Sequence, residues 1–458
     1  MPNLEPQIND TALLQERAVV LGCGVAGLAA AAALRNHYEE VVVIERDSIP
    51  ERPESRRGVP QDEQLHNLLT CAQNNLEQLM PGFLNSLIEA GAGNARVGDE
   101  THVHELGIHI PERDLGLRLM SAWRPVIEHV AREKLLDEGR VAIEGIGRAI
   151  GLRLSGEDVV TGAVIDTEMG TKVIAASLVV DATGTGSNAF KWFREHEQQT
   201  PPTDELRVNQ WYVSTLFKRP AEQVENNDFW LTFPGPAQTR GGLISPIGNE
   251  QWYVSLSGRS TDQPPRTVDE VREYAKTLDD DLSISSLIDH AEPQSKPNLF
   301  RKTNASMRRY DLLERPLQGF LPIGDSIASL NPLFGQGMSV ASWQASELDT
   351  LLGSHRLGEL DIEDLTPRYL SRALIAARSA WDLGQVVDQT IAGSSDAELE
   401  EVKIRYKALS KLIEEDPDLH RLYVSIWHLI EPASALQAPN ITDRLNIRAD
   451  EIISSSKL

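Results

Sequence analysis

The stretch Ala18-Val-Val-Leu-Gly22-Cys-Gly24-Val-Ala-Gly27-Leu decides the fold, together with Val41-Val-Val-Ile-Glu45-Arg46 further along the chain. An apolar run, a glycine-rich turn, an alanine-rich helix and a second apolar run ending in an acid follow one another at the separations of a strand–turn–helix–strand unit. Gly22 permits the tight turn, Gly24 lets a pyrophosphate approach the backbone, and Gly27 lets the helix pack against the strand. The pattern predicts a dinucleotide-binding unit, without choosing between NAD and FAD.

The two ends of this unit predict how a dinucleotide lies on it. The helix that follows the glycine turn directs free N–H groups and its positive dipole end at the phosphates. Glu45, at the end of the second strand, can accept hydrogen bonds from ribose hydroxyls and would repel a 2′-phosphate.

Composition bounds the remaining possibilities. The chain has 458 residues, enough for two or three structural units, and a net charge of -24, which argues against a nucleic-acid partner. The two cysteines, Cys23 and Cys71, do not indicate a disulfide framework. The cysteine usage favours a reducing compartment, so we expect a cytoplasmic protein. No apolar stretch is long enough to cross a bilayer, so we expect no integral membrane association. The C-terminal Ser456-Lys457-Leu458 matches a peroxisomal address, which predicts the peroxisomal matrix if the source is eukaryotic.

Two further strand-and-glycine units follow the first. One is Leu178-Val-Val-Asp181-Ala-Thr-Gly184, whose apolar run is typical of a buried parallel strand. The other contains Gly324-Asp325 and continues into Asn331-Pro-Leu-Phe-Gly335-Gln-Gly337-Met338 and a helix. Both units are therefore expected to extend the first sheet.

The intervening segments predict other elements. Residues 206–258 alternate apolar and polar side chains, which favours an antiparallel sheet that could wall a ligand pocket. About half of the aromatic residues at 211, 212, 252 and 253 should face such a pocket, because strand side chains alternate. Helices are expected over 64–79, 83–90 and 123–137, with Ser121 as a candidate cap of the last. From residue 362 onwards the pattern is helical.

As a set, these units resemble the aromatic-hydroxylase class of flavoprotein monooxygenases over about residues 17–355. That superfamily also contains squalene-epoxidase-like enzymes, polyether epoxidases, flavin halogenases and geranylgeranyl reductases. The resemblance implies an α/β fold: a Rossmann-like, glutathione-reductase-type FAD-binding domain with an inserted antiparallel-sheet substrate domain and a C-terminal helical segment. The expected boundaries are 1–60, 95–190 and 295–355 for the FAD-binding domain, 61–94 and 191–294 for the substrate-binding domain, and 356–458 for the helical cap.

The resemblance also implies the cofactor site. The first unit would hold the ADP half of FAD, Gly324-Asp325 the ribityl or ribose hydroxyls, and the 332–338 loop the isoalloxazine. Arg124 and Arg57 lie where relatives carry arginines near the flavin, with a surface salt bridge as the alternative for each. The expected cofactor-binding residues are Gly22, Gly24, Val25, Ala26, Gly27, Glu45, Arg46, Arg57, Arg124, Asp181, Gly184, Gly324, Asp325, Pro332, Gly335, Gln336, Gly337 and Met338.

The function implied is that of an FAD-dependent monooxygenase. It would insert one oxygen atom of O2, through a flavin C4a-hydroperoxide, into a lipophilic natural-product intermediate by epoxidation or hydroxylation. NADPH or NADH, or a separate flavin reductase, would donate electrons. Thr185 and Asn188 stand where relatives carry arginines, so the resemblance does not imply a conventional contact with the pyridine nucleotide at these positions. His66 is a candidate for a residue near the flavin edge, equally readable as a helix-start histidine.

Three alternatives stay open. A flavin-dependent reductase would pass hydride to a prenyl double bond, and a catalytically inactive FAD-binding protein would serve as a scaffold. A halogenase is less favoured, because the W-x-W-x-I-P motif is absent. No metal is expected, since His102 and His104 lack a matched carboxylate cluster.

Overall fold

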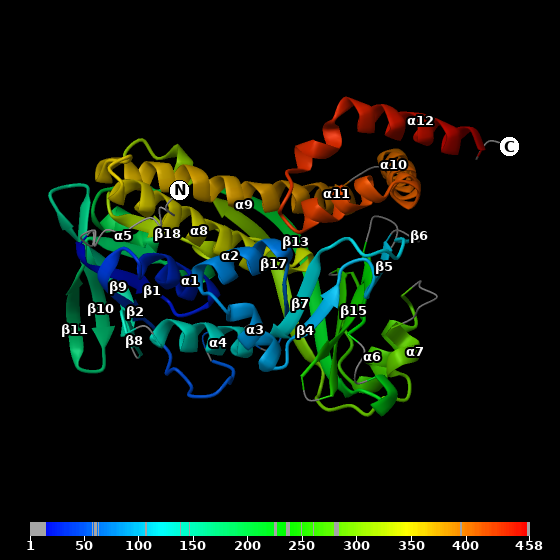
Figure 1. Cartoon of the computed structure of the whole chain (residues 1–458), viewed down its shortest axis with the longest axis horizontal. Helices are drawn as coiled ribbons and strands as arrows, with labels where there is room; N and C mark the ends of the chain where they lie inside the picture. The colour runs from blue at the N-terminus through cyan, green and yellow to red at the C-terminus, as the bar shows by residue number, and fades with distance from the viewer. Residues whose placement is uncertain are drawn as a thin grey trace, which may run out of the picture.

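The computed structural model describes residues 15–455, apart from 57, 59–61, 63, 106–107, 138, 146, 224–226, 235–238, 249, 260, 279–283 and 394–395. Arg57 and the C-terminal tripeptide therefore lie outside the described residues. The described chain forms four sheets surrounded by helices (Figure 1). The helices are α1 (Val25–Leu34), α2 (Thr70–Leu79), α3 (Phe83–Glu89), α4 (Arg124–Leu136), α5 (Ala189–Glu195), α6 (Val268–Ala275), α7 (Ile284–Ile288), α8 (Gly337–Arg356), α9 (Ile362–Gly393), α10 (Asp396–Glu415), α11 (Pro417–Trp427) and α12 (Pro439–Ser455).

A five-stranded parallel sheet carries the three glycine units. Its order is β18 (Phe320–Pro322), β12 (Leu178–Asp181), β1 (Gln15–Leu21), β2 (Tyr38–Ile44) and β8 (Val141–Glu144). Val19, Val41 and Val179 have no exposed surface, because α1 covers one face of the sheet and the antiparallel strands over residues 147–175 pack on the other, so these strands must be apolar on both sides. The predicted continuation of the first sheet into the second and third glycine units is confirmed.

Alanine and glycine allow α1 to lie close against this sheet. Every residue from Leu28 to Leu34 on the helix is fully buried, and α8 packs on α1 from the other side. A Cβ placed on Gly27 would lie 1.9 Å from the carbonyl oxygen of Gly22, so only glycine fits there. The expected role of the third glycine in helix packing is confirmed.

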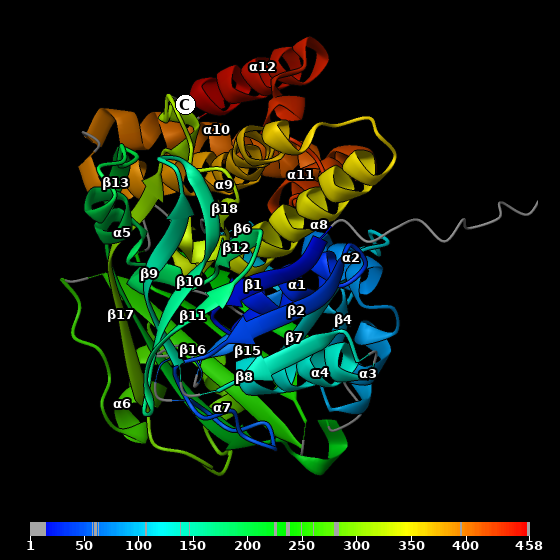
Figure 2. The same ribbon diagram turned by 90° about the vertical axis from the view of Figure 1, so that its left-hand side faces the viewer.

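An eight-stranded sheet lies beside the parallel one (Figure 2). Its order is β19 (Ala328–Ser329), β17 (Asn298–Arg308), β13 (Thr203–Lys218), β16 (Gln251–Arg259), β15 (Gly241–Ile247), β14 (Phe229–Phe233), β5 (Thr101–Glu105) and β6 (Ile108–His109). The predicted antiparallel arrangement over 206–258 is confirmed, and β5 joins the far side in parallel with β14. Strands β5, β6 and β17 belong to segments predicted for the FAD-binding domain. They are nevertheless hydrogen-bonded into a sheet whose other strands come mainly from segments predicted for the substrate-binding domain.

One face of this sheet is an apolar core. Trp211 and Trp252 are buried there against α6 and α7, in a cluster that also holds Ile284 and Ile288. Tyr212 points the other way and lines the large cavity described below. Of the four aromatic residues expected to be divided between packing and pocket, Tyr212 alone lines the cavity, while Trp211, Trp252 and Tyr253 are buried outside its lining.

Two three-stranded sheets contain the remaining strands. The order of one is β11 (Gly170–Ala175), β10 (Val159–Thr167) and β9 (Gly147–Ser155). The order of the other is β3 (Leu65–Leu68), β7 (Arg118–Trp123) and β4 (Gly93–Arg96), and this second sheet corrects a sequence prediction. The single helix predicted over 64–79 is wrong, because residues 65–68 pair with β7 and the helix begins only at Thr70. Ser121 does not cap a helix either: it lies within β7, and its hydroxyl donates to Asn67 Oδ1 at 2.8 Å.

The C-terminal segment is helical, as predicted. Helix α9 runs alongside α8, and α10, α11 and α12 gather near β5 and β6 at one end of the molecule (Figures 1 and 2). No helix among the described residues is long and apolar enough to cross a membrane.

Candidate functional site

A cavity of about 730 Å³ runs between the two large sheets. Residues from all three glycine units line it, together with the eight-stranded sheet and α11. The predicted cofactor-binding residues that line it are Gly22, Gly24, Val25, Ala26, Glu45, Arg46, Arg124, Gly184, Gly324, Asp325, Pro332, Gly335, Gln336, Gly337 and Met338. The fold therefore brings together segments more than 300 residues apart in the sequence.

The first glycine turn forms one end of the cavity. Gly22 has a φ of +103°, and a Cβ there would lie 2.6 Å from the carbonyl oxygen of Ala182, so the turn requires glycine. Helix α1 begins at Val25 after Gly24, with no side chain capping its first N–H groups. These donors face the cavity, which makes the helix N-terminus a ready anion site.

A buried charge network supports this end. Glu45 accepts hydrogen bonds from the backbone N–H of Cys23 at 2.9 Å and from Arg56 at 2.9 Å. The same guanidinium contacts Glu128 Oε2 at 2.5 Å, and all three side chains are nearly inaccessible to solvent. Burial alone would lower the pKa of Arg56, but the charges of Glu128 and Glu45 outweigh it and raise the pKa. Neither Arg56 nor Glu128 was predicted from the sequence.

Arg124 lies at the start of α4 and lines the cavity beside Gly24. Its Nε donates to Glu128 Oε1 at 2.9 Å, and Asp62 Oδ1 lies 3.9 Å away. Burial raises the pKa of Asp62, although its hydrogen bond from the Arg56 N–H opposes this. Arg124 thus forms an ion pair with a buried carboxylate, and its predicted contact with the flavin stays a prediction.

Asp181 and Gly27 do not line the cavity. The Asp181 carboxylate accepts hydrogen bonds from Thr183 and from the Ser187 hydroxyl at 2.5 Å, so it holds the turn after β12 in place. Asp181 therefore shapes the turn, and its predicted contact with a cofactor stays a prediction. Thr185 and Asn188 line the cavity beside it.

The third unit lies across from the second. Ser326 accepts a hydrogen bond from the Gly184 N–H at 2.9 Å, which joins the two turns. Burial raises the pKa of Asp325, and the charge of Lys302 opposes that rise. Lys302 also lines the cavity, and burial lowers its pKa. Sequence reasoning identified Asp325 but not Lys302.

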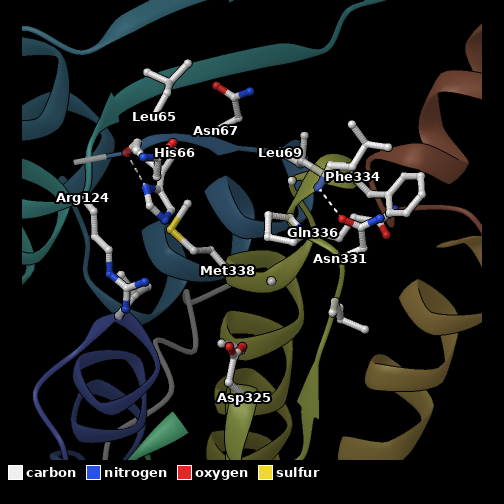
Figure 3. Close-up of a pocket in the computed structure, with 18 of the residues that line it drawn as sticks. Leu65, His66, Asn67, Leu69, Arg124, Asp325, Asn331, Phe334, Gln336 and Met338 are labelled. Carbon is white, nitrogen blue, oxygen red and sulfur yellow. Dashed lines mark hydrogen bonds between the residues drawn. The ribbon is translucent and has the colours of Figure 1, made fainter. Parts of the chain in front are cut away.

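The 332–338 loop passes along the middle of the cavity. Gly335 has a φ of +64°, and a Cβ on either Gly335 or Gly337 would have no atom within 4 Å, because both glycines face open space. Helix α8 begins at Gly337, and the Gln336 side chain donates to the carbonyl oxygen of Trp427 at 3.1 Å. Figure 3 shows Gln336, Phe334 and Met338 around this part of the cavity.

His66 lies on β3 and projects into the same part of the cavity as Met338 (Figure 3). Its Nδ1 contacts the carbonyl oxygen of Gln64 at 2.9 Å. Burial lowers the pKa of His66 to about 3, helped by the charge of Arg124. The side chain is therefore an uncharged hydrogen-bonding group near neutral pH. His66 does not start a helix, so that alternative is wrong. Its position beside the flavin stays a prediction.

Helix α11 makes a contribution that was not predicted from the sequence. Trp427 stacks on Phe334 with ring centroids 5.7 Å apart, and Phe233 of β14 packs on both rings. Tyr423 and His428 of the same C-terminal segment also line the cavity. The segment predicted as a cap thus forms one wall of the site.

Comparison with known proteins identifies the family. Residues 18–210 match the FAD-dependent oxidoreductase family. A protein of Mycobacterium tuberculosis, Protein Rv3254, is 30% identical over 354 residues, which is 73% of this chain and 72% of the relative. The chain belongs to the FAD-dependent oxidoreductases. It is thus an FAD-dependent enzyme, as the resemblance implied.

Solved structures confirm the fold of this FAD-dependent oxidoreductase. A flavoprotein/dehydrogenase from Cytophaga hutchinsonii has a TM-score of 0.67 at 16% identity, covering 96% of this chain and 100% of that one. The flavin-dependent brominase Bmp2 has a TM-score of 0.67 at 15% identity and coverages of 97% and 99%. The p-nitrophenol 4-monooxygenase PnpA from Pseudomonas putida DLL-E4 has 0.64 at 15%, with coverages of 90% and 98%. The predicted Rossmann-like architecture with its inserted sheet is the architecture that these proteins share.

Proposed function

We propose that this oxidoreductase is a monooxygenase that inserts one oxygen atom of O2 into a lipophilic small molecule. The observation that carries the proposal is the continuity of the cavity, which begins at the first glycine turn and ends in a chamber lined mainly by apolar and aromatic side chains. A hydrophobic chamber that opens directly beside a flavin site suits an apolar substrate. Epoxidation and hydroxylation both fit this geometry.

The residues present fit FAD. Uncapped N–H groups of α1 would donate to a diphosphate, and Glu45, which lines the cavity next to them, would accept from ribose hydroxyls. Asp325 faces the middle of the cavity. Gly335 and Gly337 leave open the space that a planar ring system requires. When bound, FAD would supply the electron transfer and oxygen activation that no side chain can provide.

The chain's own groups define what happens around the ring. The uncapped N-terminus of α8 directs donors at the loop where the ring's N1 and C2 carbonyl would lie, and such dipoles stabilise negative charge there. His66 offers an uncharged hydrogen-bonding ring in the same part of the cavity. The aromatic group of Phe233, Phe334 and Trp427 excludes water from the substrate side.

The test starts with the full chain as purified. We expect bound FAD in the absorption spectrum, bleaching by NADPH, NADH or a separate flavin reductase, and oxygen consumption that rises with polyene or electron-rich aromatic candidates. Products formed under ¹⁸O2 should carry one labelled oxygen atom. A matched control is Glu205→Gln, an exposed position outside the cavity, which should leave these rates unchanged.

Two other outcomes would replace the proposal. Product formation without oxygen would make the protein a reductase that passes hydride to a double bond. Bound FAD that no donor reduces would make it a scaffold without catalysis.

A further inference from the structure

Charged groups are unevenly distributed along the cavity. The lysine and arginine side chains that line the cavity come from five places in the fold. They are Arg46 after β2, Arg56 of the following connector, Arg124 of α4, Arg148 of β9 and Lys302 of β17. The chamber beyond Phe334 is enclosed by β5, β14, β15 and α11, and its apolar lining includes Val103, Leu115, Leu231, Leu243 and Val424. In the described part of the chain, Glu105 is the only carboxyl group that lines this chamber.

Glu105 is held by two tyrosines from different helices. Tyr423 Oη of α11 lies 3.1 Å from Glu105 Oε2, and Tyr406 Oη of α10 lies within hydrogen-bonding distance of Glu105 Oε1. The two phenol oxygens also contact each other. The three side chains therefore form a ring of three oxygen–oxygen contacts.

Each of these contacts needs one proton. The two phenols supply two, and an ionised carboxylate supplies none because it only accepts hydrogen bonds. If Glu105 were ionised and both phenols donated to it, the contact between the two phenol oxygens would have no proton. A protonated carboxyl group supplies the third proton and allows each group to donate once and accept once.

The surroundings of Glu105 agree with this count. Among the described residues, no lysine or arginine forms an ion pair with it, and Arg113, whose charge acts on His420, does not line the cavity. Burial raises the pKa of Glu105, against the two phenol hydrogen bonds. An unpaired buried carboxylate is costly, and protonation removes that cost.

The histidines of the chamber are uncharged as well. Burial lowers the pKa of His420 and of His428 to about 4 each. Both ring nitrogens of His420 lack a hydrogen-bond partner within the described structure, although the side chain is only 1% exposed. An uncharged imidazole carries one donor and one acceptor, so it can bind a hydroxyl or carbonyl group of a ligand.

We propose that Glu105 is a protonated, uncharged acid and that the chamber selects an uncharged lipophilic substrate with one hydroxyl or carbonyl group, positioned by His420. This inference rests on the proposed function only where it takes the chamber as the substrate site. It excludes aromatic acids and amines as good substrates, because the chamber offers neither charge a partner.

The charge of Glu105 can be read without turnover. Infrared spectra of the full chain should contain a protonated-carboxyl C=O band that disappears in Glu105→Gln and persists in the exposed control Glu205→Gln. Glutamine both donates and accepts, so Glu105→Gln preserves the ring and should fold. Absence of a band assignable to Glu105 in the wild-type protein overturns the proposal, whether or not the protein consumes oxygen.

Ligand selection is tested on the FAD-loaded protein at pH 7 with 2-naphthol, 2-naphthoate and 2-naphthylmethylamine. Equilibrium dialysis should give 2-naphthol at least about tenfold tighter binding than either ion, because a buried unpaired charge costs more than about 1.4 kcal/mol. His420→Leu should weaken the binding of 2-naphthol about 3- to 10-fold, which corresponds to the loss of one neutral hydrogen bond. The binding of naphthalene, which has no hydroxyl group, should stay unchanged. His420→Gln should restore part of the lost affinity for 2-naphthol.

The contrary results are specific. Amine binding that exceeds 2-naphthol and vanishes in Glu105→Gln would mean that Glu105 is ionised. Equal binding of 2-naphthoate would mean that the chamber accepts an anion. If none of the three binds, the chamber is not the substrate site and the selectivity half of the proposal fails.

Discussion

The buried bridge from Glu45 through Arg56 to Glu128 should be among the most costly interactions to break in this protein. Replacing Arg56 with methionine keeps most of the side chain's apolar stem but leaves Glu45 buried without a cation and Glu128 with Arg124 as its one remaining cation. Removing one partner of a buried ion pair typically costs about 3–5 kcal/mol, because the remaining charge is uncompensated. We expect Arg56→Met to lower the free energy of unfolding by that amount.

Urea unfolding of the FAD-free protein, followed by circular dichroism and tryptophan fluorescence, measures the effect as a shift in midpoint at constant slope. The matched control is Arg17→Met, which breaks the pair with Glu40, whose side chains are 38% and 44% exposed. Such an exposed pair contributes about 0–1 kcal/mol. The double variant Arg56→Met/Glu128→Gln should recover at least about 1 kcal/mol, since it removes one of the two buried negative charges that Arg56 had bridged.

Two results would refute this expectation: Arg56→Met costs no more than Arg17→Met, or the added Glu128→Gln substitution destabilises the protein further. The first result would mean that water or a rearrangement solvates the two carboxylates. The second would mean that Glu128 stabilises the fold chiefly through Arg124, its other partner.

Three further predictions concern the cavity. Gly337→Val should leave the free energy of unfolding within about 1 kcal/mol of wild type, because its Cβ meets open space. It should nevertheless reduce the FAD retained after gel filtration, because the side chain enters the space proposed for the ring. His428→Asn should lessen the loss of stability in acid. A histidine with a pKa of about 4 when folded and about 6.5 when unfolded binds its proton mainly in the unfolded state, so it lowers the free energy of unfolding increasingly as pH falls from 7, by about 2 kcal/mol at pH 5. The decrease in the free energy of unfolding between pH 7 and pH 5 should therefore be about 2 kcal/mol smaller in the variant than in the wild type. Trp427→Leu should weaken 2-naphthol binding by roughly 3- to 10-fold through loss of ring stacking, with FAD content unchanged; equal affinity would place the probe elsewhere.

The sequence predicted the parallel sheet because its signals are local. Gly22, Gly27 and Glu45 lie within one strand–turn–helix–strand unit, and each has a physical requirement that can be recognised without knowing the rest of the fold. The helix predicted over 64–79 failed for the opposite reason: residues 65–68 are extended only because β7 pairs with them, and that partner lies tens of residues away in the sequence. The position of Ser121 was misjudged for the same cause.

The site was predicted on its cofactor side and missed on its substrate side. Glycines and acids at fixed spacings mark a nucleotide. The contact between Arg56 and Glu128, and the position of Lys302 in the cavity wall, have no such spacing in the sequence. Trp427 and Tyr423 lie on an amphipathic helix whose apolar face is indistinguishable in sequence from one that packs on a core. Only the tertiary arrangement places that face over β14 and β5.

The separation of charge within one cavity follows from what each end must hold. An anionic diphosphate needs donors and cations, and the first glycine turn supplies the N-terminus of α1 with Arg124 beside it. An apolar substrate gains from being transferred to a dry surface, and any unpaired charge there would retain water. A carboxyl group in that wall is tolerated because Tyr406 and Tyr423 satisfy it in its uncharged form. Replacing either tyrosine with phenylalanine removes one proton and two contacts from the ring, so the Glu105 carboxyl group should then either draw water into the chamber or ionise, and 2-naphthol affinity should fall in both cases.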